Sequence, residues 1–172
     1  MVSGPPKGGV DLSFDSIHEG WSIYKTKDGA LIKVRQIPLR ITLVEVKEDG
    51  TGMISAGGSL FFAVTAPPEL KGPPNDQQIT QEQINAAIVE REVPFDIVRE
   101  DWSEYNAEGV KIALRVVITI VAKTSLFDAT GEPVYSVNYQ MMVRPIISAE
   151  DRARFKKIWE ERAPKKATPL GA

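Results

Sequence analysis

The stretch Gly-Val-Lys-Ile-Ala-Leu-Arg-Val-Val-Ile-Thr-Ile-Val-Ala-Lys, residues 109–123, decides the fold class of this chain. Strand side chains alternate between two faces. Here one face is fully apolar and the other is partly so, which predicts a central strand buried on both sides. The first face carries Val110, Ile112, Leu114, Val116, Ile118 and Ile120, and the second carries Ala113, Val117 and Val121.

Residues 134–144 form the partner of this strand. They alternate cleanly, and Asp128-Ala129-Thr130-Gly131 supplies turn residues between the two runs. The sequence therefore predicts a long antiparallel hairpin over residues 109–144.

A second long hairpin is predicted over residues 30–65, with its turn at residues 48–52. Its first arm does not keep one alternation phase, because the apolar positions switch parity beside Pro38 and again at Val44. Each switch requires a bulge, a bend or a break, and proline cannot donate a hydrogen bond within a sheet. We expect one bent strand or two collinear strands here.

The two hairpins align with each other at an offset of about eighty positions. Ile32 then matches Ile112, and Val34-Arg35 matches Leu114-Arg115. A duplicated half explains this match, but two apolar hairpins of similar length also match by chance.

Two short helices complete the predicted fold. Thr80 and Gln83 form a capping-box pair before one helix, and Ser148 with Asp151 begins the other, which Pro164 ends. The fold class is therefore mainly β, an antiparallel β-sandwich or open barrel built on two long hairpins, with two short α-helices. We expect a flexible N-terminal arm at 1–10, a single β-rich domain at 11–163 and a disordered C-terminal tail at 164–172.

Composition removes several classes of chemistry. The 172 residues contain no cysteine and one histidine, so disulfides, thiolate catalysis and zinc–thiolate sites are excluded. A net charge of −2 gives no general attraction to nucleic acid, which is therefore an unlikely partner. No signal peptide or membrane span is predicted, and the lack of cysteine favours a cytoplasmic location.

No cofactor is predicted, because the chain lacks the glycine-rich phosphate-binding patterns as well as HExxH and GxSxG. His18 would need an orienting acid to act as a general base, and Asp15 and Glu19 are near it in sequence. An exposed histidine without a role is the simpler interpretation.

The acidic stretch 90–108 provides the candidates for a metal or carboxylate site. Carboxylates bind divalent cations or act as acid–base pairs, although surface clusters without a motif are usually only solvated. Trp102 and Tyr105 lie beside them and offer a stacking surface for a ligand. The metal candidates are Asp96, Glu100, Asp101 and Glu104.

A second candidate ligand site contains Tyr135 and Tyr139, with Trp159 from the last helix. Tyrosines at a spacing of two are more often core residues, here expected to face the helix that carries Phe155 and Trp159.

Three functions follow from these observations. The first is a non-enzymatic interaction or assembly protein that associates with itself or with another protein, because long aliphatic hairpins need their edges protected. The second is a small-ligand-binding module that uses the aromatic candidates. The third is a carboxylate-based enzyme, with or without a metal ion, and it requires at least two of the four acidic candidates to converge.

Overall fold

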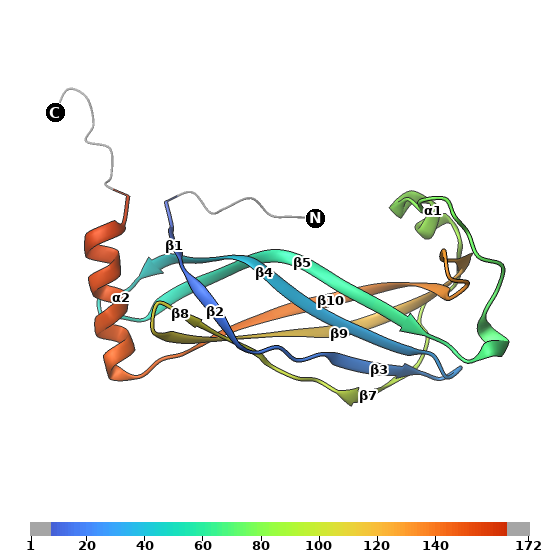
Figure 1. Cartoon of the computed structure of the whole chain (residues 1–172), viewed down its shortest axis with the longest axis horizontal. Coiled ribbons are helices and arrows are strands. Elements are labelled where there is room, and N and C mark those ends of the chain that lie inside the picture. The colour runs from blue at the N-terminus through green and yellow to red at the C-terminus, as the bar shows by residue number, and fades with distance from the viewer. Residues whose placement is uncertain (1–7, 165–172) are drawn as a thin grey trace, which may run out of the picture.

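The computed structural model describes residues 8–164, which form a two-layer β structure with one α-helix near each end (Figure 1). The strands and helices are β1 (Val10–Leu12), β2 (Phe14–His18), β3 (Ser22–Thr26), β4 (Leu31–Val46), β5 (Gly52–Thr65), α1 (Gln81–Ala86), β6 (Ile88–Glu90), β7 (Phe95–Arg99), β8 (Ser103–Ala107), β9 (Val110–Phe127), β10 (Pro133–Ile146) and α2 (Ala149–Arg162). A short 3₁₀ turn covers Pro68–Leu70.

The strands form two antiparallel sheets that pack together. Sheet A has the order β5-β4-β3-β7, and β1 also pairs with β4. Sheet B has the order β10-β9-β8-β2, and β6 also pairs with β9. The prediction of a mainly β, antiparallel sandwich with two helices is confirmed.

The two sheets are copies of one arrangement. Repeat 1, residues 10–86, runs β1 to α1, and repeat 2, residues 88–162, runs β6 to α2 in the same order. In each repeat the second strand leaves its own sheet: β2 pairs with β8 of repeat 2, and β7 pairs with β3 of repeat 1. The repeats are therefore interlocked by an exchange of one strand each.

A repeated sequence pattern accompanies this symmetry. Residues 14–24 and 95–105 share the pattern Phe-Asp-x-x-x-Glu-x-Trp-Ser-x-Tyr, in which Trp21 matches Trp102 and Tyr24 matches Tyr105. Pairing registers agree as well, since Ser22 lies opposite Val34 and Ser103 lies opposite Leu114. The hairpin match seen in the sequence is thus part of a repeat that covers both halves.

The predicted phase switches in residues 30–47 occur inside one continuous strand, β4. Its pairing with β5 shifts between Pro38 and Arg40 and again between Leu43 and Glu45. These two bulges confirm that one bent strand, not two, accommodates the changes in parity.

Strand β9 has the bulge that corresponds to the first one in β4. Its pairing with β10 shifts at Asn138 and Tyr139, opposite the segment Ile118 to Ile120. The prediction that Ile120 continues the buried face was therefore wrong: Ile120 is 37% exposed, and Val121, only 1% exposed, takes the core position.

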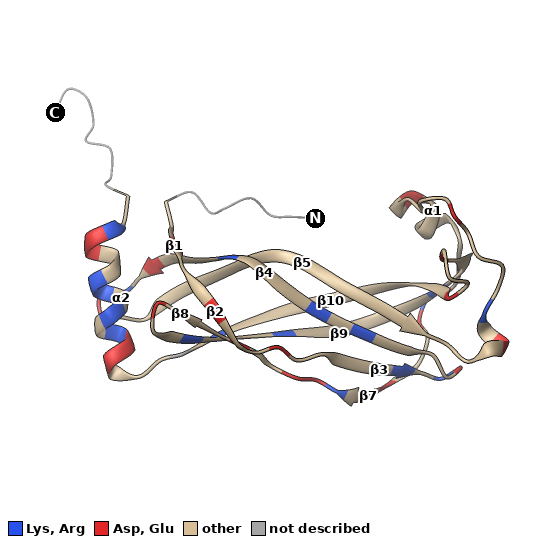
Figure 2. Ribbon diagram, viewed as in Figure 1, with Lys and Arg blue, Asp and Glu red and all other residues tan. Residues whose placement is uncertain are grey.

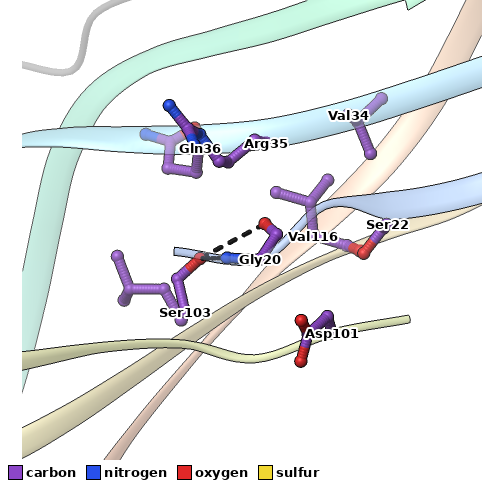
Figure 3. A pocket seen from close by; sticks show the side chains of 9 residues that line it. Gly20, Ser22, Val34, Arg35, Gln36, Asp101, Ser103 and Val116 are labelled. Atoms are coloured by element: carbon purple, nitrogen blue, oxygen red, sulfur yellow. Dashed lines mark hydrogen bonds between the residues drawn. The ribbon is translucent and has the colours of Figure 1, made fainter. Parts of the chain in front are cut away.

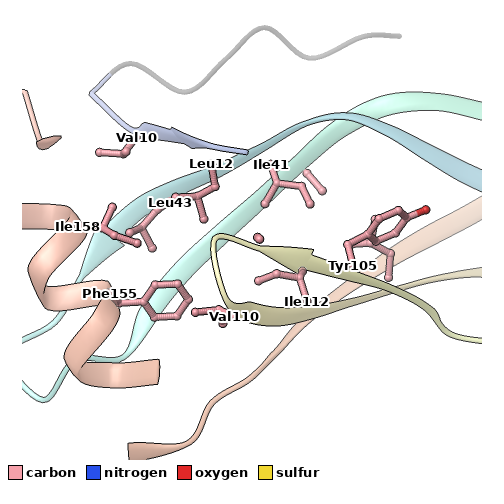
Figure 4. Close-up of a cluster of buried hydrophobic side chains, with 12 residues drawn as sticks. Val10, Leu12, Ile41, Leu43, Tyr105, Val110, Ile112, Phe155 and Ile158 are labelled. Atoms are coloured by element: carbon pink, nitrogen blue, oxygen red, sulfur yellow. The ribbon is translucent and has the colours of Figure 1, made fainter. Parts of the chain in front are cut away.

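Two hydrophobic clusters fill the space between the sheets, one toward each end. The cluster nearer α2 draws on both repeats and is covered by Phe155 and Ile158 of α2 (Figure 4). The other cluster is centred on Tyr24, Ile32 and Ile118, and α1 contributes no buried residue. Each core thus combines strands of both repeats.

Both helices begin as the sequence predicts. Thr80 with Gln83 and Ser148 with Asp151 form complete capping boxes. Val10 is buried in β1, so the folded domain includes at least this residue of the predicted N-terminal arm. Residues 1–7 and 165–172 lie outside the described range, and the arm and tail there stay predictions. Within residues 8–164, the helices are too short and too polar to cross a membrane.

Candidate functional site

The polar residues near the centre of the molecule link the two repeats. The Tyr24 hydroxyl donates to Glu100 Oε1 at 2.8 Å and accepts from the Ile118 backbone N–H at 3.1 Å. Burial raises the pKa of Tyr24 to about 12, and the neighbouring Glu100 carboxylate adds to this shift. Ser22 Oγ donates to the Val116 carbonyl at 3.0 Å. One edge of β9 pairs with β10, and β8 and β6 pair only with the two ends of its other edge. In the gap between β8 and β6, side chains of β3 therefore form hydrogen bonds with the backbone of β9.

Tyr105 occupies the equivalent position in repeat 2, but its hydroxyl is buried and finds no hydrogen-bond partner among the described residues. The backbone N–H that donates to Tyr24 belongs to Ile118, and the residue of repeat 1 that corresponds to Ile118 is Pro38. Because proline has no N–H, it cannot donate the equivalent hydrogen bond to Tyr105. Burial and the Glu19 carboxylate raise the pKa of Tyr105 above its ordinary value. Tyr105 is thus a core residue.

Each repeat also stacks an arginine on its tryptophan, outside the core. Arg35 lies 4.9 Å from the Trp21 ring centroid and Arg115 lies 4.8 Å from that of Trp102. Arg35 pairs with Glu19 at 3.4 Å, and Arg115 pairs with Glu100 at 3.8 Å. Trp102 differs in having a second guanidinium, that of Arg144, at 4.4 Å.

His18 is not isolated. Its Nε2 lies 2.9 Å from Asp101 Oδ2, and this acid comes from repeat 2, not from the neighbouring sequence. Asp101 corresponds to Gly20 in repeat 1, and a Cβ on Gly20 would clash with the Asp101 carboxylate. Gly20 and Asp101 border a cavity of about 10 Å³, which has room for no more than one water molecule (Figure 3).

The four candidate metal ligands do not converge. Glu100 binds Tyr24, Asp101 binds His18, and Glu104 Oε2 pairs with Lys111 Nζ at 3.3 Å. Asp96 is exposed on the edge strand β7. Within residues 8–164 there is no group of three or more acidic or histidine side chains that could hold a metal ion.

The aromatic ligand candidates are also dispersed. Tyr105 is buried inside the sandwich, whereas Trp102 stacks with arginines on the outside of sheet B. Tyr135 belongs to the core cluster around Tyr24, while Trp159 packs against the other cluster, and Tyr139 is 44% exposed. The expectation that Tyr135 and Tyr139 face the Phe155 and Trp159 side of the last helix was wrong, because Tyr135 and α2 lie against different cores.

Tyr135 takes part instead in a polar network at the end of the molecule away from α2. Its hydroxyl lies 3.2 Å from Asp28 Oδ2, and Lys123 Nζ lies 2.9 Å from the same oxygen. Burial and the nearby Asp28 carboxylate raise the pKa of Tyr135 to about 12. Burial alone would raise the pKa of Asp28, but hydrogen bonds from Thr26 and Lys123 outweigh it and lower that pKa.

This network replaces apolar core residues of the other repeat. Lys123 lies opposite Tyr135 in β9 and β10, and the equivalent pair in β4 and β5 is Leu43 with Ile54. Leu43 and Ile54 pack in the core that α2 covers. At the opposite end the polar residues close the sandwich, so we interpret this network as structural.

The outward-facing sides of the two sheets differ most clearly between the repeats. The outer face of sheet A carries the residues that alternate with the buried positions of β3, β4 and β5. They are Trp21, Ile23, Lys25, Leu31, Lys33, Arg35, Ile37, Ser59, Phe61, Ala63 and Thr65. Phe61 is 50% exposed, opposite Arg35.

At three equivalent pairing positions the outer face of sheet B carries a charged residue where sheet A has an apolar one, although basic residues occur along both β4 and β9 (Figure 2). Glu104 replaces Ile23, Lys111 replaces Leu31, and Arg144 replaces Ala63 at the equivalent pairing positions. Both faces lie on the same scaffold, so this difference does not come from the requirements of folding. We regard the outer face of sheet A as the candidate functional surface.

The repeated Phe-Asp-x-x-x-Glu-x-Trp-Ser-x-Tyr pattern was the signal that could have identified these paired clusters from the sequence alone. An alignment of the two long hairpins starts C-terminal to each copy of this pattern, so it does not include the pattern.

No protein-family model, curated protein or solved structure matches this chain. The second repeat is therefore the reference against which each residue of the first can be compared.

Proposed function

We propose that this protein is a non-enzymatic assembly protein that associates with a second copy of itself through the outer face of sheet A. The observation that carries the proposal is the apolar character of that face at positions where the equivalent face of sheet B bears Glu104, Lys111 and Arg144. Phe61 and Ala63 are exposed on this face, whereas Ile23 and Leu31 are half-buried. Exposed apolar surface is typical of a protein–protein contact.

The charges on this face are compatible with self-association. Lys33 lies between Ile23 and Ala63 near the middle of the face, and the Glu19 carboxylate lies at its margin beside Arg35. Because both signs are present, two copies can pack in antiparallel orientation with the basic residues of one near an acidic margin of the other.

The two alternative functions have less support. A carboxylate-based enzyme needs acidic side chains that share one pocket, and Glu100, Asp101 and Glu104 each bind a different partner. A ligand-binding module needs its aromatic residues around one cavity, and Tyr135 and Trp159 pack against different cores.

Light scattering coupled to size-exclusion chromatography tests the proposal. The informative variant combines Ile23→Glu, Leu31→Lys and Ala63→Arg, which gives sheet A the residues that sheet B already carries at the same positions. These residues suit this scaffold in repeat 2, so the variant should fold. We expect the wild type to dimerise at high micromolar concentration and the variant to be monomeric.

The matched control is Gln140→Lys, which adds a charge to an exposed position of β10 on the outside of sheet B. It should dimerise like the wild type. A wild-type protein that remains monomeric, or a triple variant that dimerises equally well, would refute self-association through this face.

A further inference from the structure

The outer face of sheet B gathers two guanidinium groups on one indole ring. Arg115 and Arg144 lie 4.8 Å and 4.4 Å from the Trp102 ring centroid, so the distance between their Cζ atoms cannot exceed the sum of these two values. A guanidinium that stacks on an aromatic face keeps its in-plane N–H groups free to donate. Arg115 already donates Nη2 to Met142 Sδ at 3.5 Å and pairs Nη1 with Glu100, so within the described residues Arg144 supplies the free donors of this arginine pair.

Comparison with repeat 1 shows that the second arginine is an addition. The residue that corresponds to Arg144 is Ala63, and among the described residues Trp21 has only Arg35 over its ring. Opposite Arg144 lies Ala113, where repeat 1 has Lys33. Ala113 is 1% exposed although it belongs to the outer face. Its small side chain lets Arg144 extend across β9 toward Trp102.

Within the described part of the chain, one of the two positive charges has an acidic partner and the other has none. Glu100 is the acid nearest to Arg115, at 3.8 Å, and its other oxygen accepts from Tyr24. No carboxylate in residues 8–164 is within ion-pair distance of Arg144. Glu104, on the same face, pairs with Lys111. The buried Nε atoms of Arg115 and of its counterpart Arg35 both lack a partner among the described residues, so this feature is common to the two repeats.

We propose that Arg115 and Arg144, held on Trp102, form a binding site for a phosphate group or a similar tetrahedral oxyanion. Arginine forks bind such oxygens through paired, charge-assisted hydrogen bonds. An anion held by the N–H groups of Arg144 would also be attracted by the nearby charge of Arg115. This site lies on the opposite sheet from the proposed assembly face and does not depend on it.

Nuclear magnetic resonance offers a direct test, because repeat 1 provides an internal control in the same sample. Inorganic phosphate is titrated into the labelled wild-type protein at constant ionic strength, with sodium chloride as the balancing salt. We expect the indole N–H of Trp102 and the Nε–H of Arg115 and Arg144 to shift in a saturable manner. The corresponding signals of Trp21 and Arg35 should not change.

The variant Arg144→Gln should weaken phosphate binding by roughly tenfold or more, because it removes one charged fork. Lys33→Gln, which removes an exposed cation from sheet A, should leave binding unchanged. The assignment is overturned if the Trp102 signals do not shift, if Trp21 shifts equally, or if Arg144→Gln binds phosphate as well as the wild type does. Arg144 is exposed, so this variant is expected to fold.

Discussion

At the scale of single residues, the internal repeat separates the effect of a side chain from that of its surroundings. Tyr24 and Tyr105 occupy equivalent positions and are both buried, yet within residues 8–164 only the Tyr24 hydroxyl has hydrogen-bond partners. The difference originates in a third residue: Ile118 donates its backbone N–H to Tyr24, and Pro38 has none to give. The same residue type therefore has different consequences for stability in the two halves.

The first prediction concerns this pair of tyrosines. Tyr24→Phe leaves the buried N–H of Ile118 and an oxygen of Glu100 without their partner, so it should lower the free energy of unfolding by about 1–3 kcal/mol. Tyr105→Phe removes a hydroxyl that has no partner, and it should change stability by less than about 0.5 kcal/mol or increase it. Paired urea denaturation curves measure both values. Equal losses in the two variants would contradict this account.

A second prediction follows from the raised pKa values of Tyr24 and Tyr135, both about 12 in the folded protein against 10.0 in the unfolded chain. Between these values the unfolded chain loses phenolic protons that the folded protein keeps. Stability is therefore fully present below pH 10 and falls as the pH rises toward 12. Each tyrosine contributes a slope of about 1.4 kcal/mol per pH unit in that window.

Denaturation curves at several pH values between 9 and 12 test this slope. Tyr24→Phe and Tyr135→Phe should each reduce it, and Tyr139→Phe, which alters an exposed tyrosine, should not. A slope that all three variants leave unchanged would show that other groups cause the loss of stability.

At the scale of elements, the two ends of the sandwich are closed by different means. Helix α2 covers one core with Phe155 and Ile158. Arg162 of α2 also binds Glu108 Oε1, at the β8–β9 turn, at 2.6 Å. At the other end the Asp28–Lys123–Tyr135 network performs this role, and α1 buries nothing. The repeats agree in their strands and differ in what covers them.

Helix α2 should therefore be essential for the stability of its core. Phe155 is fully buried in contact range of Gly52 and the adjacent strands, so Phe155→Ala should lower the free energy of unfolding by about 3–5 kcal/mol. Lys157→Ala, in the same helix but exposed, should change it by no more than about 0.5 kcal/mol. Thermal and urea unfolding can compare the two. A small effect of Phe155→Ala would mean that α2 is not needed to close this end.

At the scale of the whole molecule, local sequence signals predicted the strands and helices. Which strands pair with each other depends on contacts between residues that are far apart in the sequence. Alternation predicted both hairpins, and the parity change beside Pro38 predicted the first bulge of β4. Capping residues predicted both helix starts. None of these signals reports which strand lies beside which, because a strand as short as β2 pairs equally well with several neighbours.

The candidate sites depended on this missing information. His18 meets Asp101, and Tyr24 meets Glu100, across more than 75 positions of sequence. The acidic stretch 90–108 appeared to be one cluster because its members are close in sequence, although its acids bind partners on different elements. The repeated pattern around Trp21 and Trp102 could have indicated symmetric pairing, since two copies of one motif tend to occupy equivalent places.

The exchange of β2 and β7 leads to the last prediction, which concerns how the halves fold. Each sheet takes one of its five strands from the other repeat, and each core combines residues of both. Neither half can then complete a sheet or bury its core alone. A chain divided between Gln77 and Gln78, two exposed residues in the connection between β5 and α1, should not fold from either fragment separately.

The two fragments should assemble when they are expressed together. We expect a 1:1 complex that survives affinity purification through a tag on one fragment and that has the circular dichroism spectrum of the intact chain. Isolated fragments should lack cooperative unfolding. As a control, Phe155→Ala in the second fragment should weaken the complex, because Phe155 packs in a core that includes Ile41 and Leu43 of the first. A fragment that folds cooperatively as a monomer would show that the repeats are independent units, and that the exchanged strands join them without being required by either.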